Sequence, residues 1–162
     1  MRERRQNPAG RAATADVPRI TLGGLRLAVL DLEGTANFMI DMVFPQRRVP
    51  RPLYLTSANG EVLARCSTEP GTDRLFRAAD LINADGQPLV TLSRFKSPTP
   101  LPERVATTDL FDVVARKAQA AGLTFYMFGA DEAENAAAVA RVRGRYPDLK
   151  IVGHSHGYFR GE

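Results

Sequence analysis

The chain has 162 residues, of which 44% are hydrophobic and 25% charged, and this size and composition are typical of one globular domain with a core of its own. Its net charge is +4, and residues 1–19 supply +3 of it through five arginines against two acidic residues, so the rest of the chain is nearly neutral. This balance argues against a nucleic-acid-binding domain, and no apolar run approaches the roughly 18 residues that a transmembrane helix needs.

The first 20 residues are predicted to form a disordered basic tail, and residues 21–162 to form the folded domain. The tail lacks the apolar stretch of a secretory signal, so it either only solvates the terminus or attracts anionic lipid or nucleic acid. The single cysteine, Cys66, excludes an internal disulfide and is typical of a reducing compartment. We therefore expect a cytoplasmic protein in which Cys66 is a half-buried residue on a helix.

Hydrophobic periodicity and turn residues divide the rest of the chain into alternating strands and helices. Strands are predicted at residues 21–30, 53–56, 81–82, 123–128 and 149–152. Helices are predicted at residues 31–44, 60–65, 73–79, 88–95, 109–121 and 131–142, with Asp109 as the N-cap of the fifth and Gly144 ending the last. This order predicts an α/β fold, a Rossmann-like parallel sheet with right-handed crossovers and helices on both faces.

Polar residues follow two of the predicted strands. Ser57 and Asn59 come directly after residues 53–56, and Asp85-Gly86 follows residues 81–84. Neighbouring parallel strands end at one crevice, where a hydroxyl, an amide and a carboxylate would bind a sugar and accept a proton. Two plainer interpretations stay open: Asn59 or Ser57 caps the next helix, and Asp85-Gly86 is an ordinary turn.

Three further features are less specific. Gly129 begins a strand-to-helix turn of a kind that can hold phosphate, but the acidic residues after it favour sugar or nucleoside contacts instead. Arg104 either pairs with a diphosphate or bridges to Asp109 on the surface. His154 and His156 share one side of an extended segment, but no cysteine or carboxylate cluster accompanies them, so we expect no metal site and no cofactor.

Taken together, six segments in order resemble the WecG/TagA/CpsF family of bacterial glycosyltransferases (glycosyltransferase family 26). The family reads T-x-N-x-E, A-D-x-x-x-x-D-G, R-V-x-G-x-D-L, a G-G/A turn, Y-P-x-L-x-I-V-G and G-Y-F. The corresponding segments here are residues 57–61, 79–86, 104–110, 128–130, 146–153 and 157–159. The resemblance covers about residues 21–159.

The resemblance implies an inverting transfer of a sugar, N-acetylmannosamine or a relative, from a UDP donor to a sugar on a polyprenyl diphosphate. Asp85 matches the family's general base, Ser57 its active-site threonine, and Asn59 its sugar-contacting asparagine. Gly86 and Gly129 fall at substrate-binding positions, and Arg104 at a basic position suited to the diphosphate. The resemblance also implies a role in exopolysaccharide or cell-wall glycopolymer assembly, at the inner face of the cytoplasmic membrane and with peripheral membrane contact.

Three departures from the family pattern stand out. Serine replaces threonine at Ser57, and Thr107 stands where the family usually has glycine. Family members also continue past G-Y-F through further strand–helix units, a P-K-Q-E loop and a basic C-terminal appendage. The chain is therefore expected to be incomplete at its C-terminus, with little activity by itself and with exposed apolar surface that favours a homo-oligomer. The alternative function is a catalytically silent truncated paralogue that binds a nucleotide-sugar or a partner without turnover.

Overall fold

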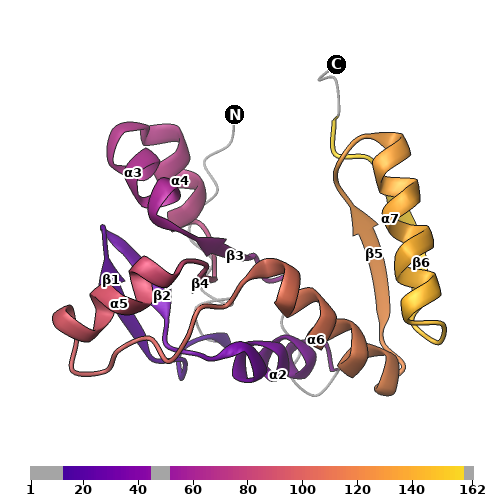
Figure 1. The fold of residues 1–162 in the computed structure, drawn as a ribbon, viewed down its shortest axis with the longest axis horizontal. Helices are drawn as coiled ribbons and strands as arrows, with labels where there is room; N and C mark the ends of the chain where they lie inside the picture. Colours follow the sequence, from indigo (N-terminus) through magenta and orange to yellow (C-terminus); the bar gives the residue numbers. More distant parts are fainter. Residues whose placement is uncertain (1–12, 45–51, 159–162) are drawn as a thin grey trace. The chain divides into compact units, whose positions relative to one another are not determined.

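The structure is a computed structural model that describes residues 13–44 and 52–158. Strands and helices are interspersed along the chain (Figure 1). In order they are β1 (Arg19–Leu22), β2 (Leu25–Ala28), α2 (Leu32–Val43), β3 (Leu55–Ala58), α3 (Gly60–Thr68), α4 (Pro70–Arg77), β4 (Leu81–Ala84), α5 (Gln87–Lys96), α6 (Thr107–Ala120), β5 (Thr124–Phe128), α7 (Glu132–Arg145) and β6 (Lys150–Ser155). The predicted α/β fold with parallel strands is confirmed.

The chain divides into two compact units, Met1–Phe111 and Asp112–Glu162, and the boundary falls inside α6. The first unit holds the β1–β2 hairpin and the parallel pair β3–β4. The second holds the parallel pair β5–β6 with α7 packed on it. Among the described residues, no helix is long and apolar enough to cross a bilayer.

The predicted strand at residues 21–30 is instead a two-stranded hairpin. Gly23 and Gly24 both have positive φ angles, 54° and 82°, and reverse the chain between β1 and β2. Such φ angles cost glycine little, and they match the twist of a two-residue hairpin turn. Ordered structure also begins before residue 21, because Thr14 is fully buried and Arg19 starts β1. Residues 1–12 of the predicted tail lie outside the described residues.

The core of the first unit gathers around β4, whose four residues are all buried. Leu25 and Leu27 of the hairpin are at most 1% exposed and belong to the same cluster as Ile82 of β4. Burial of each such side chain contributes about 1.5–3 kcal/mol, so this cluster fixes the position of β4. Cys66 of α3 joins it at 8% exposure, more buried than predicted, and burial raises the pKa of its thiol.

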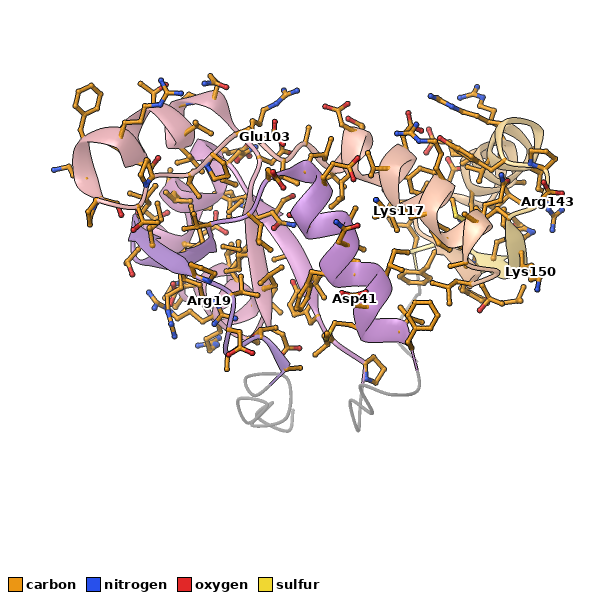
Figure 2. The ribbon with its side chains drawn as sticks, turned by 90° about the horizontal axis from the view of Figure 1, so that it is seen from below. Arg19, Asp41, Glu103, Lys117, Arg143 and Lys150 are labelled. Atoms are coloured by element: carbon orange, nitrogen blue, oxygen red, sulfur yellow. The ribbon has the colours of Figure 1, made fainter. Side chains whose placement is uncertain are left out.

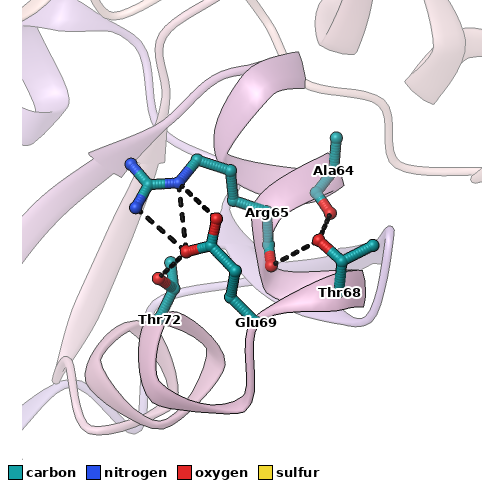
Figure 3. A network of polar contacts seen from close by, with 5 residues as sticks. All are labelled: Ala64, Arg65, Thr68, Glu69 and Thr72. Carbon is teal, nitrogen blue, oxygen red and sulfur yellow. Dashed lines mark hydrogen bonds and ion pairs between the residues drawn. The ribbon is translucent and has the colours of Figure 1, made fainter.

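Helices α3 and α4 meet at Glu69, and α3 is longer than the predicted residues 60–65 (Figure 3). The Glu69 carboxylate accepts hydrogen bonds from Arg65 Nε at 3.1 Å and from Thr72 Oγ1 at 2.6 Å. The hydrogen bond from Arg65 lowers the pKa of Glu69. These groups are exposed, so the network defines the geometry of the junction more than it stabilises the fold.

Two helix ends in the last third of the chain differ from the prediction. Helix α6 begins at Thr107, and Asp109 lies in its first turn rather than at the N-cap. Helix α7 runs through Gly144 to Arg145, because a glycine inside a helix costs only about 1 kcal/mol and does not end it. Asp131 caps α7 by accepting a hydrogen bond from Glu134 N at 2.8 Å.

Asp112 of α6 ties this helix to the end of α7 within the second unit. Its carboxylate accepts hydrogen bonds from Tyr146 Oη at 2.5 Å and from Arg145 Nη2 at 2.7 Å. Tyr146 is 4% exposed, and burial followed by the hydrogen bond to Asp112 raises its pKa. The folded protein therefore holds the phenol proton more tightly than the unfolded chain does.

We predict that Tyr146→Phe lowers the free energy of unfolding at pH 7 by about 1.5–3 kcal/mol, because a hydrogen bond to a charged group is lost. This contribution is fully present below the ordinary tyrosine pKa of about 10. It is lost as the pH rises through the raised pKa of the folded state, so the wild type and the variant should converge in alkali. Urea unfolding between pH 7 and 11 measures this difference, and parallel pH profiles would contradict it.

Candidate active site

The carboxyl ends of β3 and β4 lie side by side, as the sequence predicts. Ser57 lies within β3 rather than after the strand as predicted, and in the parallel register it is opposite Asn83, while Ala58 is opposite Ala84. The next residue, Asp85, donates its backbone N–H to Ala58 O at 2.9 Å. Both strand ends therefore deliver their polar residues to one edge of this strand pair.

Asp85 and Gly86 link β4 directly to α5. The Gly86 carbonyl accepts hydrogen bonds from Leu89 N and Val90 N, which begins the helix. Gly86 packs on the other strand end, since a Cβ built on it would lie 3.6 Å from Asn59 Cβ. Asp85 is half-buried, and its carboxylate makes no hydrogen bond or ion pair with any described residue. This junction thus presents a carboxylate that the fold itself does not use.

Asn59 takes the capping role that the sequence left open. Its Oδ1 accepts a hydrogen bond from Val62 N at 3.0 Å, and its carbonyl accepts one from Leu63 N. The residue is nevertheless exposed, and no described residue accepts a hydrogen bond from its amide N–H groups. A cap and a sugar contact are therefore compatible at this residue.

Ser57 contacts a residue that the sequence analysis did not count as part of the site. Its Oγ lies 2.9 Å from Thr107 Oγ1, at the start of α6. Val105 N donates to Ala84 O at 2.8 Å and holds this segment against the end of β4. The two residues are 50 positions apart, and only the path of the intervening loop brings them together.

Three more residues behind this edge were missed by the sequence analysis. Asn83 is 3% exposed, and its Oδ1 accepts a long, 3.5 Å hydrogen bond from Thr35 Oγ1 of α2. Glu103 comes from a later loop, and its side chain contacts the start of α2, where its Oε1 accepts a hydrogen bond from Leu32 N at 2.6 Å (Figure 2). The polar Asn83 inside an apolar strand was the available signal, because buried amides need partners.

Arg104 forms the surface bridge that was one of its two predicted roles. Its Nη2 lies 3.3 Å from Asp109 Oδ2, and the two side chains are 49% and 56% exposed. Exposed pairs of this kind contribute only about 0.2–1 kcal/mol. The bridge can therefore open at little cost.

Gly129 belongs to the second unit. Its φ is +134°, and Asn135 Nδ2 donates to its carbonyl at 3.0 Å. Since carbonyl oxygens only accept, Asn135 Oδ1 must face His154 Nδ1, which lies 2.8 Å away and therefore carries the hydrogen. His154 thus supports the turn, and the described residues hold no group of three His, Cys, Asp or Glu suited to a metal.

A cavity of about 140 Å³ lies at the opposite end of β4 from Asp85. Arg19 and Arg77 reach it, but Arg19 donates to Asp80 O and Arg77 pairs with Asp73. These arginines have structural partners, and the lining contains none of the candidate site residues. We therefore place the candidate site at the edge that holds Asp85.

We predict that Asn59→Ala lowers the free energy of unfolding by about 0.5–2 kcal/mol, because the cap of α3 is lost. Asn59→Ser should retain most of the stability, since a serine hydroxyl also caps a helix. Thermal or urea unfolding of the three proteins measures this. Equal losses in both variants would show that the cap is not what Asn59 supplies.

The comparisons with known proteins identify the family of the chain. The Glycosyl transferase WecG/TagA/CpsF family matches residues 20–162. One relative is the N-acetylglucosaminyldiphosphoundecaprenol N-acetyl-beta-D-mannosaminyltransferase of Bacillus spizizenii, 28% identical over 109 residues. The aligned part is 67% of this chain but 42% of the relative, so the chain spans less than half of that protein. Because the family match runs through nearly all of the folded part, the chain belongs to the WecG/TagA/CpsF family of glycosyltransferases.

Proposed function

We propose that this chain carries the catalytic edge of an inverting glycosyltransferase. The reaction would move a sugar from a UDP donor to a sugar on a polyprenyl diphosphate. The named relative transfers N-acetylmannosamine to an acceptor of that class, which favours an N-acetylmannosamine-like donor sugar here. The product would enter exopolysaccharide or cell-wall glycopolymer assembly.

The observation that carries this proposal is the Asp85 carboxylate. It is half-buried at the end of β4, and no described residue pairs with it. Such a group can take the proton of an acceptor hydroxyl while the hydroxyl oxygen attacks the anomeric carbon. The bond from that carbon to the UDP oxygen breaks on the opposite side, and direct displacement inverts the configuration.

The neighbouring residues suit the other parts of the substrates. Ser57 and Asn59 offer a hydroxyl and an amide to sugar oxygens, and Gly86, which packs against Asn59, would contact the same sugar. Arg104 can exchange its exposed bridge to Asp109 for the leaving diphosphate, whose negative charge it would stabilise. For Gly129, which belongs to the second unit, we propose a contact with the sugar or the nucleoside of the donor.

The acceptor also determines where such a protein works. A polyprenyl chain stays in the bilayer, so we propose action at the cytoplasmic face of the membrane with peripheral contact. We also propose that the protein self-associates. Leu75 and Phe95 are 64% and 80% exposed, and contact with a second copy would remove such apolar surface from water.

We predict that Asp85→Asn lowers turnover by about 10²-fold or more, in line with general-base contributions, while the fold survives. The assay uses UDP-N-acetylmannosamine and N-acetylglucosaminyl-diphosphoundecaprenol, with circular dichroism as the folding control. Asp41→Asn is the matched control, since Asp41 is an exposed aspartate of α2 with no part in the proposed chemistry.

Two results would count against general-base catalysis. Near-normal turnover of Asp85→Asn would remove Asp85 from the reaction. Binding of the UDP-sugar by the wild type with no transfer to the acceptor would instead favour the catalytically silent alternative.

We further predict that Asn59→Asp separates the two roles of Asn59. Aspartate caps helices as well as asparagine does, so the stability should stay within about 0.5 kcal/mol of the wild type. The carboxylate has no N–H to donate, so kcat/KM should fall at least tenfold if the amide binds a sugar oxygen. Unchanged kinetics would leave Asn59 as a cap alone.

A further inference from the structure

Ser57 lacks the local restraint that a branched side chain would give it. Serine carries one heavy atom on Cβ, so its χ1 angle samples three staggered wells, whereas threonine is β-branched and more restricted. A hydroxyl that must point at a substrate therefore needs an outside contact when it belongs to serine. Among the described residues, the one hydrogen bond of Ser57 Oγ is to Thr107 Oγ1, at 2.9 Å.

Thr107 is itself held in place by the backbone. It is the first residue of α6, and this helix start is fixed by Val105 N donating to Ala84 O at 2.8 Å. Leu110 N donates to Ala106 O at 2.9 Å, which closes the first turn. Thr107 Oγ1 makes no hydrogen bond to the described backbone of α6, so capping does not account for its orientation. Among the described residues, its one hydrogen bond is to Ser57.

We infer that Thr107 is a positioning residue for Ser57. Either hydroxyl can donate in this pair. When Thr107 donates to Ser57 Oγ, the Ser57 hydrogen is left for a substrate oxygen. The two departures noted in the sequence, serine at 57 and threonine at 107, are then one paired feature: the restraint that a β-branch would supply at position 57 comes from position 107. The role in catalysis rests on the proposed function, whereas the restraint on the Ser57 side chain does not.

The first test measures the Ser57 χ1 angle in the whole chain by NMR, from the Hα–Hβ couplings of labelled serine. The wild type should show one rotamer, and Thr107→Val, which keeps the shape and removes the hydroxyl, should show averaged couplings. Thr107→Ser should restore the wild-type couplings. Thr108→Val is the matched control one residue along the same exposed helix start, and it should leave Ser57 unchanged.

The second test is a double-mutant cycle on the transfer reaction. Thr107→Val should lower kcat/KM about 3- to 10-fold, the size expected for one neutral hydrogen bond. The same substitution in a Ser57→Thr background should have little effect, because the threonine restrains its own χ1 angle. An equal fall in both backgrounds would show that Thr107 acts on something other than Ser57.

The two tests fail separately. If the wild type transfers no sugar, the proposed function fails while the couplings still decide the restraint on Ser57. If Thr107→Val leaves the Ser57 couplings at one rotamer, the inference about Thr107 is overturned whatever the activity. A thermal midpoint within a few degrees of the wild type confirms that each variant is folded.

Discussion

The parallel register between β3 and β4 is the constraint on which the candidate site depends. It places Ser57 opposite Asn83 and ends both strands at one edge. Because side chains alternate along a strand, a slip of one residue would turn every side chain of β4 to the other face. That slip would move Ile82 out of the core and Asn83 away from Thr35. The same apolar residues that stabilise the first unit therefore determine where its polar edge lies.

Two aspartates flank β4, and only the side chain of Asp80 is hydrogen-bonded within the described fold. Asp80 is 7% exposed at the start of the strand, where its Oδ2 accepts a hydrogen bond from Tyr54 N at 2.8 Å. Its backbone N–H donates to Tyr54 O, so the residue fixes where the pairing of β3 and β4 begins. Asp85, at the other end, uses its backbone in the same way, but its carboxylate has no partner among the described residues. The pairing of the strands therefore does not use the Asp85 carboxylate, which stays available for the role proposed for it.

The sequence predicts the features that depend on neighbours along the chain. The alternation of strands and helices, the strand ends at Ser57 and Asp85, and the capping role of Asn59 all follow from short-range patterns. The hairpin was missed although the sequence carries a signal for it. Gly23-Gly24 is a common two-residue turn, and the apolar positions change phase across it, from Ile20 and Leu22 to Leu25 and Leu27. The Ser57–Thr107 contact was missed for a different reason. It depends on the path of a 50-residue stretch, which no local propensity encodes.

Arg104 shows how an unremarkable surface contact can still fit a functional role. Asp109 lies in the first turn of α6, where the helix dipole already favours a negative charge. The carboxylate therefore does not need Arg104, and the exposed bridge adds little to stability. A guanidinium held this loosely keeps its charge available and needs no buried pair to be broken before it binds an anion. The side chains of Asp85 and Arg104, for which we propose roles on the substrates, thus contribute little to the fold, whereas those of Asp80 and Asp112 are hydrogen-bonded within it.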